Sequence, residues 1–475
     1  MKNNINTLLK NSIKNMFYTF SVQSLALIIN MARVLLIPKV IGIEDYSYWQ
    51  LFLFYIGFVG FFHFGFNDGI YLRYGGVTYK ELDKEKLRSY FYILVTKLTL
   101  IASGIIIYSL TFYGGEERFT VWIGTAICLI VNNIIGYIGI ILQCTNKFKD
   151  YSKIILLDKL VFLILLFLLL FFKFLNYEYY IIAYVTSTFI SLIFALYICR
   201  DLIFGKVISL MPSLRGYLIN IKIGSFLMVA NIASMLILGF GRFLIDEIWG
   251  INTFGEISLS ISITSMLLIF INAISIVLFP ALRQTAEENH AQTFVTIRVL
   301  LTFLLMCTLL LYGPIEFFLQ WWLPEYSESL RFLIILFPLC IFEGKMQMLL
   351  GTYLKVLRYE KILLRVNLIS LLISVLLCLY SGYILKDIKW ILISMVVGII
   401  IRSIITEFYL AKKFNVSFIK ISLSEMFLTI IFMIVTWYSP VTLFSFFFYL
   451  LSLIIFTTIN KREIRNSFNI IKKYF

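Results

Sequence analysis

Charged residues are scarce in this sequence. Only 14% of the 475 residues are charged, 61% are hydrophobic, and the mean hydropathy is +0.93. Soluble domains are typically about half apolar and about a quarter charged. Because a soluble chain of this length could not bury so much apolar surface, the composition excludes a soluble globular protein and predicts an integral membrane protein.

Metal-binding and catalytic signatures are also missing. The two histidines, His63 and His290, are far apart, and the six cysteines form no CxxC pair. The sequence contains neither a GxxxxGK[ST] phosphate loop nor an HExxH motif. No segment between apolar runs exceeds about 25 residues, which is too short for a separate catalytic domain. We therefore expect no metal site, no cofactor and no enzymatic activity.

Long apolar segments fill the chain instead. A helix needs about 20 mostly apolar residues to cross a bilayer, and about fourteen segments meet this requirement. The expected fold class is therefore an all-α integral membrane bundle. The predicted spans are residues 14–38, 46–66, 89–112, 119–143, 152–173, 178–199, 219–243, 254–279, 293–314, 329–353, 363–385, 389–411, 421–438 and 441–459.

The distribution of lysine and arginine predicts the topology. The loops on the side of both predicted termini hold 29 of these residues, and the opposite loops hold 8. Cytoplasmic loops of membrane proteins carry the excess of positive charge. Both termini are therefore expected to be cytoplasmic. The same rule explains the net charge of +15 without a nucleic-acid partner.

A weak internal repeat divides the predicted helices. Arg33 is followed by GIEDYS at residues 42–47, and Arg242 is followed by GINTFG at residues 250–255. Both copies start on the cytoplasmic side, which predicts two six-helix lobes in a parallel pseudo-repeat. Two further helices follow the repeat. The expected parts are residues 1–207 for the N-terminal lobe, 208–415 for the C-terminal lobe, and 416–475 for helices 13 and 14 with a cytoplasmic tail.

Polar and cationic side chains inside the spans are candidates for substrate binding. Such residues are costly in lipid, so they usually face a bundle interior or a hydrated cavity. Three helices carry polar stripes, and guanidinium and ammonium groups favour an anionic cargo. Hydrogen bonding between helices, or snorkelling of the arginines to headgroups, is the alternative. The candidates are Gln23, Asn30, Asn132 and Asn231, with the cations Arg33, Lys97 and Arg242.

Acidic side chains inside or near the spans are candidates for binding a coupling ion. These candidates are Asp68, Asp158 and Glu343. The alternative for each is an ion pair, and for Asp68 also a hydrated interface. Glu343 and Lys345 are two positions apart on one helix, so they point in different directions and each needs its own partner.

The stretch from Leu36 to Gly76 resembles a known family. It contains the turn after the first span, the segment GFNDG at Gly65–Gly69, and the run LRYGG at Leu72–Gly76. These features resemble the start of Wzx-type oligosaccharide flippases, the polysaccharide transporters of the multidrug/oligosaccharidyl-lipid/polysaccharide (MOP) exporter superfamily. Ser47 departs from the family's usual glycine in the first turn, whereas Gly255 keeps it in the second.

The resemblance implies a function and a location. It implies alternating access through a partly cationic cavity in a bacterial cell membrane. The cargo would be a polyprenyl-pyrophosphate-linked oligosaccharide, moved from the cytoplasmic to the outer leaflet for surface polysaccharide synthesis. A glycan polymerase or chain-length regulator is an expected partner. In relatives, cavity cations meet the pyrophosphate, and Arg33, Arg242 and Lys97 fit that role here.

Other functions remain open at this point. A cation-coupled multidrug or metabolite antiporter of the same superfamily usually has twelve helices and an acidic site in its first lobe. A membrane glycosyltransferase or glycan polymerase would need a large outer loop with catalytic side chains. A membrane scaffold would not need polar stripes in both lobes. The extra helices and the cations favour the flippase.

Overall fold

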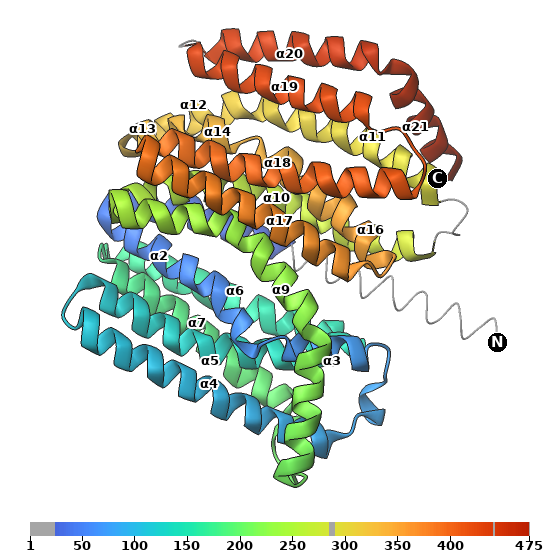
Figure 1. The fold of residues 1–475 in the computed structure, drawn as a ribbon. Coiled ribbons are helices and arrows are strands. Elements are labelled where there is room, and N and C mark those ends of the chain that lie inside the picture. The colour runs from blue at the N-terminus through green and yellow to red at the C-terminus, as the bar shows by residue number, and fades with distance from the viewer. Residues whose placement is uncertain (1–23, 285–289, 440–441, 475) are drawn as a thin grey trace. The chain divides into compact units, whose positions relative to one another are not determined.

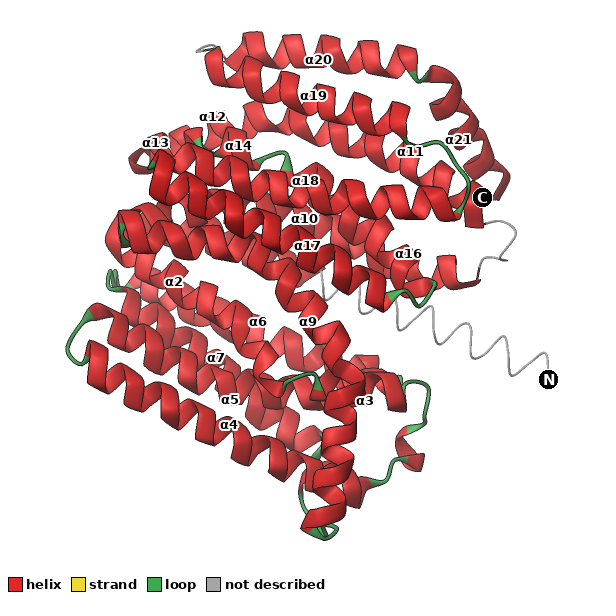
Figure 2. Cartoon of the chain, viewed as in Figure 1, coloured by secondary structure: helices red, strands yellow, loops and turns green. Residues whose placement is uncertain are grey.

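The computed structural model describes residues 24–284, 290–439 and 442–474. All regular elements in these ranges are helical, as Figure 2 shows, so the predicted all-α class is confirmed. After a first helix at residues 24–40, the α-helices are α2 (Ile43–Val59), α3 (Phe66–Tyr74), α4 (Lys84–Tyr113), α5 (Glu117–Cys144), α6 (Phe148–Phe171), α7 (Tyr177–Ile198), α8 (Arg200–Ile203), α9 (Leu210–Trp249), α10 (Ile251–Gln284), α11 (His290–Thr308), α12 (Tyr312–Trp322), α13 (Ser327–Arg331), α14 (Leu333–Leu336), α15 (Leu339–Lys345), α16 (Gly351–Val356), α17 (Glu360–Leu379), α18 (Ile388–Lys413), α19 (Ile419–Tyr438), α20 (Thr442–Ile459) and α21 (Lys461–Tyr474).

The spans are numerous enough for a multi-pass membrane protein. Eleven helices in the described ranges are long and apolar enough to cross a bilayer, or 13 if each of two bent helix pairs is one span. The predicted number of fourteen is not confirmed. Its first span, 14–38, begins within residues 1–23, which lie outside the described residues, and only residues 24–40 of that helix are described.

The chain divides into two compact units. Unit 1 ends at Ile232 and unit 2 begins at Ala233, so the division falls inside α9. The three-part division at residues 207 and 415 stays a prediction. Each unit is described separately below.

Helix α5 is the central helix of unit 1. It packs against α2, α4 and α7 (Figure 1). Two thirds of its most apolar stretch, 67%, is buried inside the protein, compared with 17% for α6. The outer helix can therefore be apolar on every side because it faces lipid, whereas polar side chains on α5 must find partners within the unit.

The helix that begins at Ile43 is broken within unit 1. Phe64 and Gly65 both adopt left-handed backbone angles, with φ of 55° and 82°, and the two halves α2 and α3 meet at 57°. A Cβ on Gly65 would lie 2.8 Å from the backbone carbon of Gly224. The GFNDG segment therefore contacts α9 closely at this break. Only glycine fits at position 65.

The most deeply buried span of unit 2 runs from Leu333 to Val356. It consists of α14, α15, a π-helical turn at Met346–Leu350 and α16, and 89% of its most apolar stretch is buried. It packs against α10, α11 and α18. Glu343 and Lys345 on this span are buried, so other helices of the unit must neutralise their charges.

Candidate functional site

Arg33 lies inside unit 1 without an ion pair. Its side chain is half-buried, and its Nε makes no hydrogen bond to any residue that the structure describes. Tyr184, Tyr46 and Asp158 are the groups near enough to act on its charge. These neighbours come from α7, α2 and α6, so Arg33 faces protein rather than lipid. A half-buried guanidinium without a carboxylate within ion-pair distance can bind an anionic ligand.

Asp158 is held by neighbours other than Arg33. Its carboxylate lies 2.7 Å from Nζ of Lys159 and accepts a hydrogen bond of 3.1 Å from the Ser187 hydroxyl. Asp158 therefore forms its ion pair with the adjacent residue of its own helix, α6. Asn132 of α5 lies beside the Tyr184 hydroxyl. The structure thus places Asn132, Asp158 and Arg33 around one tyrosine.

Lys97 is another cation of unit 1 without a carboxylate partner among the described residues. Its Nζ is buried and makes no hydrogen bond within the described ranges. It lies 4.7 Å from the ring centre of Phe64 and 5.4 Å from that of Tyr217. Aromatic faces partly compensate a desolvated ammonium group but do not neutralise it. Lys97 therefore places an ammonium group without a carboxylate partner beside the break between α2 and α3.

Asp68 lies at the start of α3, on the same break. Its carboxylate is 3.9 Å from Nε2 of His63, whose Nδ1 accepts a hydrogen bond from the Gly65 backbone. Asp68 is partly buried. Sequence analysis left Asp68 as an ion-binding group, a member of an ion pair or a residue at a hydrated interface, and the structure places it in a weak contact with histidine. The coupling role stays a prediction.

The remaining candidates are spread over the helices. Arg242 of α9 donates a hydrogen bond of 2.8 Å to Ser258, and its guanidinium lies 5.0 Å from the Phe254 ring centre. Asn231 is exposed, and Asn30 is partly buried one helical turn before Arg33. Gln23 lies outside the described residues. Their roles in substrate binding stay predictions.

Unit 2 contains a buried ionic cluster that sequence reasoning did not assemble. Lys345 pairs with Glu407 at 2.8 Å and also with Glu425, and all three side chains are 1% exposed. Arg298 lies 3.6 Å from Glu407. The residues come from α11, α15, α18 and α19. Two positive and two negative charges balance here, so the cluster joins helices rather than attracting a charged cargo.

Glu343 has a separate partner, as expected. It accepts a hydrogen bond from Arg402 and another, of 2.7 Å, from Gln347. Arg402 also donates to the Ser234 hydroxyl. Lys345 and Glu343 therefore point to different partners, which confirms the geometric argument from their spacing. Neutralisation of Lys345 and Arg402 removes both from the set of free cations.

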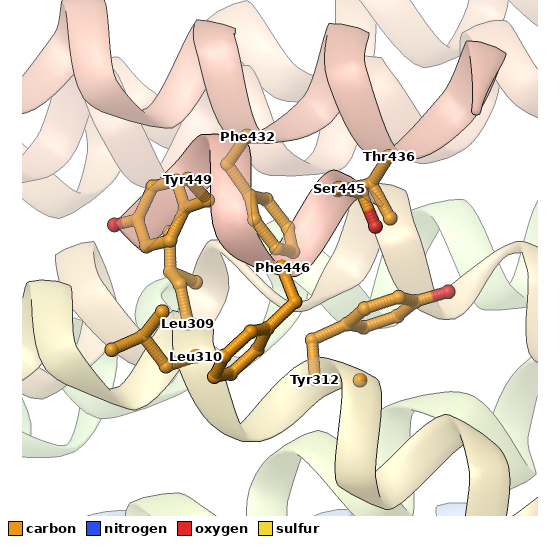
Figure 3. Close-up of a pocket in the computed structure, with 9 residues that line it drawn as sticks. Leu309, Leu310, Tyr312, Phe432, Thr436, Ser445, Phe446 and Tyr449 are labelled. Atoms are coloured by element: carbon orange, nitrogen blue, oxygen red, sulfur yellow. The ribbon is translucent and has the colours of Figure 1, made fainter. Parts of the chain in front are cut away.

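A small pocket in unit 2 is too narrow for a cargo. Its space of about 10 Å³ is roughly that of one water molecule. Figure 3 shows aromatic side chains from α12, α19 and α20 converging on it. The lining residues are Leu309, Leu310, Tyr312, Gly313, Phe432, Thr436, Ser445, Phe446 and Tyr449. This site is a packing gap between helices.

Known structures share the fold. The lipid II flippase MurJ in an inward closed conformation matches with a TM-score of 0.64 and 16% identity, covering 94% of this chain and 99% of that chain. An inward-facing multidrug resistance MATE family transporter of the MOP superfamily matches with a TM-score of 0.59 and 13% identity, covering 84% and 98%. An outward-facing one gives 0.54 and 14%, covering 84% and 95%.

Sequence comparison defines the family. No curated protein sequence gives a significant match. The family model described as polysaccharide biosynthesis protein matches residues 12–286, which is more than half of the chain. The multi-pass helical bundle agrees with this match, and the chain belongs to the polysaccharide biosynthesis protein family.

Proposed function

We propose that this protein flips polyprenyl-pyrophosphate-linked oligosaccharides from the cytoplasmic to the outer leaflet of a bacterial cell membrane by alternating access. A sugar headgroup cannot cross hydrocarbon, so it needs a solvated path lined by polar groups. Its lipid tail can remain in the bilayer. Membership of the polysaccharide biosynthesis family and the MurJ-like fold support this cargo class.

One observation carries the proposal. Arg33 is half-buried in a helical unit without an ion pair to any described residue, and Lys97 lies beside two aromatic rings without a carboxylate partner among the described residues. Keeping a partly desolvated charge without a counter-ion costs free energy. A purely structural role for these residues offers no interaction that offsets this cost. A pyrophosphate supplies the missing negative charge, and a guanidinium can bind it through two hydrogen bonds.

A cation-coupled antiporter of the same superfamily is the second candidate. The likeness to the MATE family structures favours it, because two of them cover 84% of the chain. The flippase structure covers 94%, so its fold accounts for more of the chain. The antiporter would need a carboxylate that exchanges cations during transport, and Asp68, Asp158 and Glu343 are its candidates.

Reconstituted transport tests the proposal. The purified protein is placed in liposomes with a labelled polyprenyl-pyrophosphate oligosaccharide, and the rate at which the sugar becomes accessible to an external lectin is measured. Loss of one charge-assisted contact costs about 1.5–3 kcal/mol, which corresponds to roughly 10- to 100-fold. Arg33→Ala and Arg242→Ala should each slow flipping by at least about tenfold.

The matched control is Arg215→Ala, because Arg215 is an exposed residue near the start of α9. This variant should flip the lipid at the rate of the unmodified protein. Full activity in the double variant Arg33→Ala/Arg242→Ala would remove both arginines from the path. Cation-driven export of a drug, without movement of the lipid-linked sugar, would support the antiporter instead.

A further inference from the structure

The last helix of the chain turns away from the span that precedes it. The segment Leu443–Ile459 is apolar, and together with Lys461–Ser467 it is long enough and apolar enough for a membrane span. Residues Lys461–Ser467 continue at an angle of 73° to it. A helix that leaves a span at such an angle, with charges in its first turn, lies along the surface of the bilayer rather than through it.

One face of α21 is fixed to the protein. Helix α21 packs against α11, and Asn466 and Ser467 line a groove together with Val295 and Val299. Ser467 is buried. This packing holds α21 in a fixed direction, so the residues on its other face have a defined position at the end of α20.

The other face of α21 is cationic. Lys461, Arg462 and Arg465 are exposed, and none of them forms an ion pair with another described residue. The acidic residue of this turn, Glu463, is 3.2 Å from Lys420 and is therefore already neutralised. Three positive charges are left without compensation within about one and a half helical turns.

These cations border a groove. It has a volume of about 580 Å³ and lies at the bend between α20 and α21. Amide and hydroxyl groups complete its lining, and both groups donate hydrogen bonds to phosphate oxygens. The lining residues are Thr458, Ile459, Lys461, Arg462, Arg465, Asn466 and Asn469.

We propose that Lys461, Arg462 and Arg465 form a binding site for the headgroup of an anionic phospholipid in the leaflet where α20 ends. Two guanidinium groups bind phosphate oxygens in bidentate geometry, and the lysine adds a point charge. A zwitterionic headgroup is disfavoured because three unpaired cations repel its ammonium. The site requires only that α20 spans the membrane, and it does not depend on which cargo the protein carries.

The proposal is tested by lipid binding to the full-length protein in detergent. Native mass spectrometry measures the binding of phosphatidylglycerol and of phosphatidylcholine. The test variant is Lys461→Gln/Arg462→Gln/Arg465→Gln. The control variant, Lys361→Gln/Arg365→Gln/Lys412→Gln, removes the same charge from exposed positions of α17 and α18 in the same unit.

The unmodified protein and the control should prefer phosphatidylglycerol. The α21 variant should lose this preference, with phosphatidylglycerol affinity reduced by at least about tenfold, because each basic residue at a surface contributes to the attraction of anionic lipid. Arg465→Gln alone should give a smaller loss, and the thermal unfolding midpoint shows whether each variant is folded.

Two results would overturn the proposal. One is equal phosphatidylglycerol binding by the α21 variant and the control variant. The other is displacement of the lipid by millimolar inorganic phosphate, which would assign the cations to a free anion. Flipping is measured separately, so a failure here leaves the proposed cargo untouched.

Discussion

At the residue scale, two classes of charge inside the helical units differ in their partners. Lys345, Arg298, Glu407 and Glu425 balance one another within unit 2. Arg33 and Lys97 in unit 1 have no carboxylate within ion-pair distance in the described ranges. Removing one of the paired charges in unit 2 leaves a buried charge of opposite sign without a partner. Removing Arg33 or Lys97 does not. The two classes therefore predict opposite effects on stability.

Lys345→Met should destabilise the protein strongly. It leaves Glu407 and Glu425 facing each other with only Arg298 nearby. Breaking a buried pair by removing one partner typically costs about 3–5 kcal/mol. The measurement is the thermal unfolding midpoint in detergent, and adding Glu425→Gln should recover part of the loss. A shift no larger than that of the exposed control Lys361→Met would contradict this assignment.

Lys97→Met should leave stability unchanged or raise it, because the substitution removes an uncompensated charge from between two aromatic rings. The rate of lipid flipping should fall by about tenfold if this ammonium contacts the pyrophosphate. Unfolding midpoint and flipping rate are measured on the same preparation. A large drop in the midpoint would mean that Lys97 is structural, and Lys97→Arg should preserve both properties.

At the element scale, the break between α2 and α3 depends on one glycine. Gly65 combines a φ of 82° with the close backbone of Gly224. A side chain there meets two penalties, the left-handed conformation and the contact with α9. The break brings His63, Phe64 and Asp68 together beside Lys97. An unbroken helix would separate these groups.

Gly65→Ala should therefore destabilise unit 1. The left-handed conformation costs about 1–2 kcal/mol for a residue with a Cβ, and the clash adds to this. Gly104→Ala is the matched control, because a Cβ at that position in α4 meets no atom within 4 Å and alanine favours helix. Equal unfolding midpoints for the two variants would show that the break tolerates a side chain.

At the scale of the whole molecule, the distribution of charge determines the orientation. The expected cytoplasmic position of both termini is tested with a membrane-impermeant thiol reagent on intact cells. Lys173→Cys lies in a predicted outer loop and should be labelled, whereas Arg215→Cys lies on the predicted cytoplasmic side and should not. Labelling of Arg215→Cys but not of Lys173→Cys would show that the orientation is opposite to the predicted one. The proposed lipid site on α21 would then lie on the outer side.

Hydropathy and charge along the chain were enough to predict an all-α membrane protein and the places of most spans. Hydropathy and the positive-inside rule are local properties, read from about 20 neighbouring residues at a time, so they need no knowledge of the packing. The resemblance at Leu36–Gly76 likewise indicated the family that the match to residues 12–286 defines. The bend at Phe64 and Gly65 was not predicted: the predicted span ends at residue 66, before the polar residues Asn67 and Asp68, and hydropathy does not show that the chain continues as a second helix at an angle.

Which charges lack an ion-pair partner, and could therefore bind a ligand, depends on how the helices pack. The pairs of Lys345 with Glu407 and Glu425 join residues 62 and 80 positions apart, and that of Arg402 with Glu343 joins residues 59 apart. No pattern along the chain identifies such partners, because the direction of a side chain depends on how whole helices pack. A buried charge becomes structural or functional according to whether packing brings an opposite charge within a few ångströms, and only the folded chain fixes that distance.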